Sequence, residues 1–158
     1  MATKSVQLLF FPAPPPPTPL GNYRLLSPNA AVRVSPLAFG TMSLGTAWDD
    51  SMGAVDKEQS FKLLDTYFDG GGNFFDTSNG YQNEESEKIL GEWMEVRGVR
   101  DRCIVATKYT GDYRLHELGK GNTTINYSGN SKIAMNLSVR DSLTKLRTGW
   151  IDIFFVHW

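Results

Sequence analysis

The stretch GGGNFFDTSNGYQNEESEKILG, residues 70–91, decides the fold. Its glycines end one helix, the apolar run NFFD (73–76) is typical of a short strand, and an amphipathic segment from about Glu84 begins the next helix. A carboxylate at the end of a buried strand is costly without a partner, so Asp76 requires one from elsewhere in the chain. The stretch therefore predicts a strand, a loop and a helix, with an ionisable group where the strand ends.

The composition limits the classes of partner. The chain has 158 residues, enough for one ordinary domain with a sizeable core. Its 16 basic and 17 acidic residues favour neither nucleic acid nor an anionic membrane, which leaves a small molecule as the expected partner. No apolar run approaches the ~20 residues that cross a bilayer, and VQLLFF (6–11) is too short for a secretory signal. We expect a cytoplasmic protein with Cys103 as a buried structural thiol, and the oligomeric state stays open.

Two regions follow from the proline content. PAPPPPTP (12–19) favours an extended polyproline segment, because each ring fixes φ and removes a donor. A tail or spacer is the simpler interpretation, and an SH3-type ligand is the alternative. We expect a flexible proline-rich segment over residues 1–22 and one folded domain over residues 23–158.

The remaining pattern predicts an α/β fold. YRLLSPNAAVRVS (23–35) indicates a short β-hairpin around a Ser-Pro-Asn turn. Short apolar runs then alternate with amphipathic stretches, which implies a parallel sheet with crossover helices. The expected strands are PLAFG (36–40), NFFD (73–76), CIVATKY (103–109) and IDIFFVHW (151–158). With about four parallel strands and three helices after the hairpin, the pattern matches the N-terminal half of a (β/α)8 TIM barrel.

The helices have their own signals. The first begins after Asp56, which can cap it while Gln59 closes a capping box. The second follows Glu84. The third comes after a polar loop over residues 110–130, and we expect its inner face to carry Ile133, Leu137, Leu143 and Leu146.

Three of the four expected strands end in an ionisable residue. Asp76 ends the second strand, Lys108 the third and His157 the fourth. Tyr81 follows Asp76 in the next loop. In parallel α/β folds the working groups gather at the carboxyl ends of strands, and strand alternation places these three tips on one face. We therefore expect the four side chains to meet over one pocket.

This set points to proton transfer by a tyrosine. A free phenol has a pKa near ~10, and an adjacent ammonium favours the phenolate. Lys108 would supply the ammonium, Asp76 would keep it charged and oriented, and a substrate oxygen would accept a hydrogen bond from His157. Each residue taken singly is more often structural, so the interpretation depends on their joint occurrence. The sequence predicts general acid catalysis by Tyr81.

Four stretches resemble the aldo-keto reductase superfamily, in particular its fungal branch of aryl-alcohol dehydrogenases and norsolorinic acid reductases. They are FGTM (39–42), FFDTSNGYQNEESEKILGEWM (74–94), IVATKY (104–109) and IDIFFVHW (151–158), and the resemblance runs from about Tyr23 to the end. It implies a TIM barrel that uses NADPH, and so the NADP couple, to reduce an aldehyde or ketone, with aryl carbonyls in fungal secondary metabolism as the expected substrates.

The resemblance also implies roles for individual residues and no metal. Tyr81 would be the proton donor, supported by a set that comprises Asp76, Lys108 and His157. The cofactor-binding residues would be Asp76, which contacts the nicotinamide ribose, and Gly40, Thr41 and Met42 at the end of the first strand. The substrate would lie against Trp48, His157 and the loop after Tyr109.

The chain departs from the family in its length. A full barrel has eight strands, and only four are expected here, with the last residue one position past His157. In the family, later strands supply further groups that bind the cofactor. We therefore expect a truncated gene model or splice product whose open strand edges and exposed apolar face lower its solubility. Whether such a chain keeps or loses activity stays open.

Two other interpretations stay open at this point. One is a non-catalytic binding subunit or pseudoenzyme of the same superfamily, with the proline segment as a partner ligand. The presence of both Tyr81 and Lys108 favours chemistry instead. The other is a phosphate-binding module, which would require a glycine-rich loop followed by Lys-Ser/Thr, a pattern that the sequence lacks.

Overall fold

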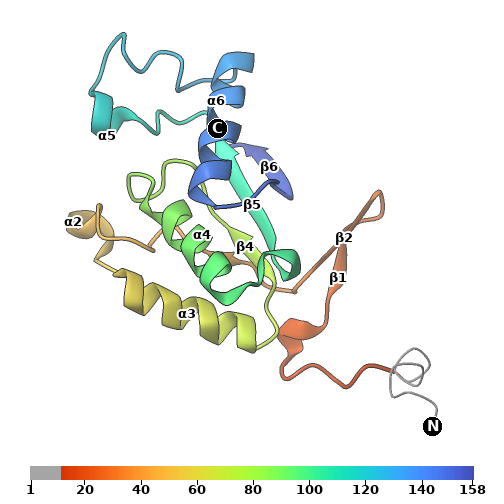
Figure 1. Cartoon of the computed structure of the whole chain (residues 1–158). Helices are drawn as coiled ribbons and strands as arrows, with labels where there is room; N and C mark the ends of the chain where they lie inside the picture. The colour runs from red at the N-terminus through yellow and green to blue at the C-terminus, as the bar shows by residue number, and fades with distance from the viewer. Residues whose placement is uncertain (1–11) are drawn as a thin grey trace.

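A parallel sheet organises the computed structural model, which describes residues 12–158 (Figure 1). The start of the predicted proline-rich segment and the run VQLLFF lie outside the described residues. The four strands lie in sequence order, β3-β4-β5-β6, and each neighbouring pair is parallel. Their bounds are Phe39–Gly40, Phe74–Asp76, Ile104–Tyr109 and Ile153–Val156. The predicted α/β order of four parallel strands is therefore confirmed.

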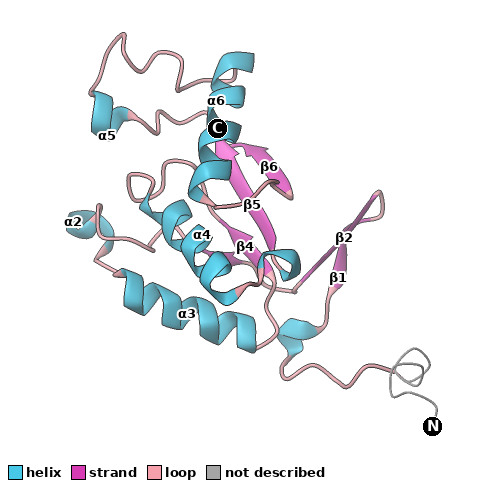
Figure 2. Ribbon diagram, viewed as in Figure 1, coloured by secondary structure: helices cyan, strands magenta, loops and turns pink. Residues whose placement is uncertain are grey.

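Helices connect these strands (Figure 2). Three longer helices, α3, α4 and α6, span Lys57–Asp69, Glu85–Arg97 and Lys132–Lys145. One-turn helices, α2 (Asp49–Met52) and α5 (Leu115–Leu118), lie in loops where the sequence pattern predicted no helix. Short 3-10 turns occupy Pro19–Gly21 and Arg100–Arg102. The strand-to-helix order thus follows the prediction, and the additions are confined to loops.

One face of the sheet carries the core. Phe75 of β4 and Val105 of β5 are fully buried and belong to the same apolar cluster. Side chains from α3 and α4 complete that cluster, among them Leu64, Leu90 and Trp93. Burying each of these apolar side chains stabilises the fold by about 1.5–3 kcal/mol. The apolar cluster therefore holds α3 and α4 against this face of the sheet.

The helix ends follow the expected local chemistry. The Oδ1 atom of Asp56 accepts a hydrogen bond from the backbone N–H of Gln59 at 2.9 Å, so the predicted N-cap of α3 is confirmed. Gly98 ends α4 with a left-handed φ of 63°. A residue without Cβ adopts this conformation at little cost, which explains why the helix stops there.

The buried face of α6 differs from the prediction. Ile133 is 49% exposed, so its expected inward position was wrong. Leu146, just past the helix, is buried as expected. The buried positions within the helix are Ala134, Ser138, Ser142 and Lys145. The physical reason is that α6 packs against polar groups of α4 and of the loop after β4, which require hydrogen-bonding partners rather than apolar ones.

The predicted hairpin is present ahead of the sheet. Strands β1 (Arg24–Ser27) and β2 (Ala30–Val34) pair in antiparallel fashion. The side chain of Asn73, just before β4, accepts from Ser35 N at 2.7 Å and donates to Arg33 O at 3.0 Å. The hairpin is therefore attached at the amino end of β4, opposite the loops that follow the strands.

The outer strand β6 leaves apolar surface open. Phe155 and Val156 are 43% and 53% exposed, and within the described residues β6 has a strand neighbour on one side only. This agrees with the expected exposure of apolar groups on an open sheet. No helix among residues 12–158 combines the length and the apolar character that a membrane crossing requires.

Cys103 gives a first testable prediction. Its side chain is 2% exposed, and burial is the main cause that raises the pKa of Cys103 to about 12. Because the thiolate is the reactive species, we expect native protein to resist iodoacetamide at neutral pH and unfolded protein in guanidinium to react readily. Mass spectrometry after timed labelling measures both rates. Equal rates in the two states would contradict the buried position.

Candidate active site

The four ionisable side chains predicted from the strand ends lie together. Lys108 Nζ donates to Asp76 Oδ1 at 2.6 Å and to the hydroxyl of Tyr81 at 3.3 Å. The Tyr81 hydroxyl lies 3.4 Å from Nε2 of His157. A continuous row of polar contacts therefore runs from Asp76 through Lys108 and Tyr81 to His157.

Lys108 is the centre of this row. Besides its contacts to Asp76 and Tyr81, its Nζ donates to the backbone carbonyl of Thr77 at 2.7 Å. All three N–H groups of the ammonium thus have an acceptor. The Lys108 side chain is 13% exposed, and its Nζ lies 4.9 Å from the ring centroid of Tyr81. The Lys108 ammonium is therefore the partner that the Asp76 carboxylate requires, and its contacts hold it beside the phenol of Tyr81.

His157 also contacts the Tyr81 phenol. Its ring meets the Tyr81 ring edge-on, with centroids 5.7 Å apart, and its Nδ1 lies 3.3 Å from Ser78 Oγ. Burial lowers the pKa of His157, and the nearby positive charge of Lys108 lowers it further against the opposing effect of Asp76. A neutral imidazole has one donor nitrogen and one acceptor nitrogen. Near neutral pH, His157 can therefore donate one hydrogen bond without carrying charge.

The loop that carries Tyr81 has an unusual backbone. Gln82, Asn83 and Glu84 have successive positive φ values of 52°, 50° and 75°. Left-handed residues other than glycine cost about 1 kcal/mol or more each, so the surroundings must hold them. The Gln82 side chain donates to Met42 O at 3.0 Å and accepts from Trp48 N at 2.9 Å. These two hydrogen bonds connect the loop after β4 to the loop after β3. The sequence pattern did not predict them.

A cavity of about 430 Å³ opens beside the phenol. Its walls are largely aromatic and include Met42, Trp48, Tyr81, Tyr113, His157 and Trp158. Trp48, predicted to border the substrate, lies edge-on to Tyr81 at 6.4 Å, and its Nε1 donates to Asn83 Oδ1 at 3.0 Å. Tyr113 comes from the loop after β5, which we expected at the substrate without naming a residue. Aromatic walls of this kind suit a flat apolar ligand.

The residues predicted to bind a cofactor lie at the end of β3. Gly40 pairs with Asp76 in the strand ladder, and Thr41 N donates to Asp76 O at 2.9 Å. A Cβ built on Gly40 would meet no atom within 4 Å, and the buried Thr41 Oγ1 has no hydrogen-bond partner in the described part of the chain. Met42 is 41% exposed at the cavity wall. The chain thus leaves open space at Gly40, next to Asp76, whereas the unpartnered Thr41 Oγ1 is buried.

One group among the described residues has the composition of a metal site. Ligand atoms of Glu84, His116 and Glu117 lie within 4.8 Å of one another. However, Glu84 is paired with Lys145 at 2.9 Å, and Glu117 with Arg114 at 2.6 Å. Side-chain cations already neutralise both carboxylates, so this group gives no argument for a bound metal.

Known proteins match over most of the chain. "Aldo-keto reductase ausK" of Emericella nidulans is 58% identical over 149 residues, which are 94% of this chain and 37% of the relative. "Aryl-alcohol dehydrogenase [NADP(+)]" of Phanerodontia chrysosporium is 51% identical over 154 residues, 94% of this chain and 39% of the relative. "Norsolorinic acid reductase stcV" of Emericella nidulans is 52% identical over 146 residues, 92% and 37% of the two chains. The chain therefore spans less than two fifths of the length of these relatives.

The fold has a similar relative among solved structures. A holo-form aldo-keto reductase from Bacillus halodurans superposes with a TM-score of 0.66 at 30% identity. The superposition covers 84% of this chain and 38% of that chain. The predicted likeness to the fungal aryl-alcohol dehydrogenase and norsolorinic acid reductase branch is confirmed by the curated relatives. Because residues 36–158 match the "Aldo/keto reductase family", the chain belongs to the aldo/keto reductase family.

Proposed function

We propose that residues 23–158, after a proline-rich segment over residues 1–22, carry the catalytic half of a cytoplasmic, NADPH-dependent carbonyl reductase. Its substrates would be aldehydes or ketones, aryl ones in particular, in fungal secondary metabolism. The reverse direction is an aryl-alcohol dehydrogenase reaction. The observation that carries the proposal is the ammonium of Lys108 held between the carboxylate of Asp76 and the phenol of Tyr81. The names of the curated relatives support the choice of substrate and cofactor.

The chemistry follows from the contacts. When bound, NADPH supplies a hydride to the carbonyl carbon. Tyr81 donates its phenolic proton to the carbonyl oxygen, so that the product is an alcohol. Lys108 stabilises the phenolate that remains, and Asp76 keeps the ammonium oriented. In the oxidative direction the same phenolate accepts the alcohol proton.

His157 would orient the substrate oxygen. As a neutral imidazole it donates one hydrogen bond to the carbonyl beside the phenol, and its contact to Ser78 Oγ fixes the plane of the ring. The carbonyl oxygen then accepts hydrogen bonds from two donors, the Tyr81 hydroxyl in the loop after β4 and the His157 N–H just after β6. Such preorganised donors stabilise developing negative charge on the oxygen.

The low pKa of His157 predicts how stability depends on pH. The unfolded chain binds a proton near the ordinary histidine pKa of ~6.5, whereas the native site resists that proton to lower pH. Stability due to this residue is therefore complete above about pH 6.5 and decreases as the pH falls toward the lower native value. Urea unfolding of the parent and of His157→Gln at both ends of this range measures it. The parent should lose more stability than the variant, and equal losses would contradict the neutral imidazole.

Binding of NADPH gives the direct test of the proposed function. Titration of the chain, followed by nucleotide fluorescence, should show saturable binding that weakens in Asp76→Asn, because the Asp76 carboxylate would contact the ribose. Turnover of benzaldehyde against an aliphatic aldehyde of equal carbon number then tests the aryl preference of the cavity. No binding at high micromolar NADPH would remove the reductase proposal for this chain.

A chimera separates a wrong site from an incomplete barrel. It carries residues 23–158 in place of the matching part of the Phanerodontia chrysosporium dehydrogenase, which is 51% identical to this chain. Turnover in the chimera supports the proposed chemistry even where the chain alone is inactive. A chimera that binds NADPH without turnover would instead identify a non-catalytic binding subunit.

A further inference from the structure

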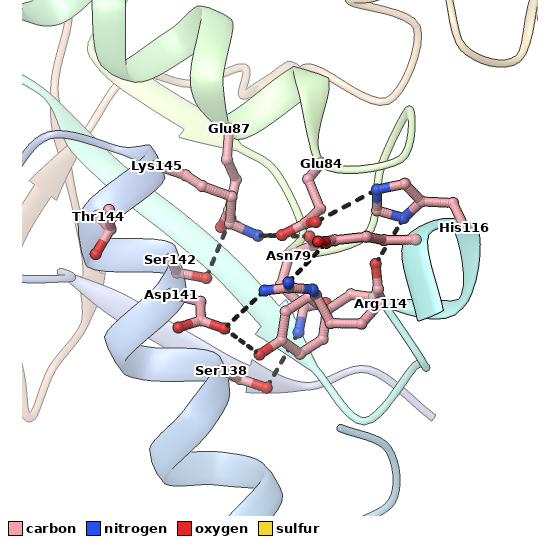
Figure 3. Close-up of polar contacts among 12 residues, drawn as sticks. Asn79, Glu84, Glu87, Arg114, His116, Ser138, Asp141, Ser142, Thr144 and Lys145 are labelled. Carbon is pink, nitrogen blue, oxygen red and sulfur yellow. Dashed lines mark hydrogen bonds and ion pairs between the residues drawn. The ribbon is translucent and has the colours of Figure 1, made fainter. Parts of the chain in front are cut away.

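A buried polar network connects α6 with Asn79 and Glu84, the residues on either side of Tyr81 in the chain (Figure 3). Its groups come from α6, from α4, from β5 and from the loops that follow β4 and β5. On α6, Ser138 accepts from Asn79, Ser142 donates to Glu87 and Lys145 donates to Glu84. Asp141, also on α6, accepts from Tyr113. None of these residues belongs to the row of groups assigned to the proposed chemistry.

Lys145 connects most of this network. It is 7% exposed, and its Nζ donates to Asn79 O at 2.8 Å and to Glu84 Oε1 at 2.9 Å. The same Nζ lies 2.9 Å from Glu87 Oε2. Asn79 and Glu84 are the two ends of the segment that contains Tyr81. One ammonium on α6 therefore holds both ends of the segment that presents the phenol.

The partners of Lys145 are themselves fixed. Glu87 is fully buried, and its carboxylate accepts from Thr107 Oγ1 at 2.6 Å and from Ser142 Oγ at 3.1 Å. Asn79 Nδ2 donates to Ser138 Oγ at 3.1 Å. Since Thr107 immediately precedes Lys108 on β5, the Glu87 carboxylate links the strand that carries the ammonium to α6.

Lys145 also contacts Tyr113, which lines the cavity beside Tyr81. Its Nζ is 4.9 Å from the ring centroid of Tyr113, and the Tyr113 hydroxyl donates to Asp141 Oδ2 at 2.7 Å. Tyr113 and Asn79 both line the cavity. A single side chain of α6 thus contacts groups on two loops that shape the place where a substrate would bind.

Stability alone does not account for this arrangement. Removing charges from water costs several kcal/mol per ion, and apolar residues of similar volume in place of a buried ion pair are often as stable or more so. The left-handed run from Gln82 to Glu84, by contrast, requires an external restraint to persist. The contacts of Lys145 supply that restraint where the run ends.

We propose that Lys145 is a positioning residue, which holds the segment from Asn79 to Glu84 so that the Tyr81 hydroxyl stays within reach of Lys108 and His157. The expected effect of Lys145 on turnover rests on the proposed function. Its expected effect on the position of the Tyr81 ring is independent of that function. A displacement of about 1 Å at a reacting group can cost roughly 100-fold in rate, so a restraint on this loop would act on catalysis without contact to the substrate.

The design of the variant decides the test. Lys145→Met alone leaves the buried carboxylates of Glu84 and Glu87 without their cation and is expected to unfold the chain. The informative variant is therefore Lys145→Met/Glu84→Gln/Glu87→Gln, which removes the three charges and keeps the side-chain sizes. Its matched control, Arg100→Met/Asp152→Asn, removes another shielded ion pair, with side chains 13% and 16% exposed, from the opposite end of the sheet.

Two measurements follow. In the chain with ¹³C-labelled tyrosine, NMR should show the Tyr81 ring resonance, identified by its loss in Tyr81→Phe, shifted or broadened in the triple variant, while the resonance of Tyr67 beside the hairpin is unchanged. Turnover of an aryl aldehyde should fall roughly 10- to 100-fold in the triple variant and less than about 2-fold in the control. Parental Tyr81 resonances in the triple variant would overturn the proposal. If neither the parent nor its chimera shows turnover, the proposed function fails, and the NMR comparison still decides the role of Lys145.

Discussion

Replacement of Tyr81 by Phe is expected to lower the rate of carbonyl reduction by about 10²–10⁴-fold while the affinity for NADPH stays near that of the parent. The change removes only the Tyr81 hydroxyl, which accepts a hydrogen bond from Lys108 Nζ at 3.3 Å and lies 3.4 Å from Nε2 of His157. The ring remains, and with it the edge-on contacts to Trp48 and His157. Loss of the proton donor therefore affects kcat, because the hydroxyl acts on the oxygen only as negative charge develops there. Steady-state kinetics and a fluorescence titration measure the two quantities.

Tyr67→Phe is the matched control. The Tyr67 hydroxyl donates to Leu37 O at 2.7 Å and lies 2.7 Å from Ser35 Oγ, so this change removes a phenolic hydroxyl near the hairpin with shorter hydrogen bonds than that of Tyr81. It should lower the free energy of unfolding by about 1 kcal/mol and leave kcat unaltered. If Tyr81→Phe reduced aldehydes as fast as the parent, the general acid would have to be another group, with His157 as the nearest candidate.

The meeting of the four ionisable groups could be predicted because strand order decides it. Neighbouring parallel strands end at one edge of a sheet, so residues at the ends of β4, β5 and β6 must lie close together once the order is known. In the structure Asp76 pairs with Ala106, and Lys108 lies two positions further along β5, with its side chain on the same face. The periodicity of the apolar runs was sufficient for this part of the site.

The network around Lys145 could not be predicted in the same way. Apolar periodicity assigns inward positions to apolar residues, and it placed Ile133 on the inner face of α6, although that residue is 49% exposed. The inner face is polar because Glu84 and Glu87, distant in sequence, require partners there. Such a requirement is a property of the assembled fold and has no local signal.

The backbone of the loop after β4 escaped prediction for a related reason. Glycine is the usual sign of a left-handed residue, and the run QNEE (82–85) contains none. Side chains on other elements hold these residues in place, among them Trp48 and Lys145. Tertiary contacts thus override a local preference at the point where the proposed acid is presented, as is common at functional sites.

Gly91→Ala is expected to lower the free energy of unfolding by about 2–3 kcal/mol. Gly91 lies within α4, where alanine would ordinarily favour the helix by about 1 kcal/mol. A Cβ at this position would lie 2.3 Å from Lys145 O and 2.6 Å from Leu146 Cα, and these are backbone atoms that cannot rotate away. The helices must separate to admit the methyl group, so the loss of packing outweighs the gain in propensity. Urea denaturation followed by circular dichroism measures the net effect.

Gly149→Ala tests whether this effect belongs to the helix contact. A Cβ on Gly149 meets no atom within 4 Å, and its φ is not in the left-handed region, so alanine there should be neutral or stabilise by about 0.4–1 kcal/mol. Gly91→Ala should also move the end of α6, which carries Lys145, away from Glu84 and Glu87, and so should alter the Tyr81 ring resonance. A Gly91→Ala protein as stable as the parent would show that α4 and the end of α6 do not approach so closely. The support that Lys145 gives to the loop of Tyr81 depends on that approach.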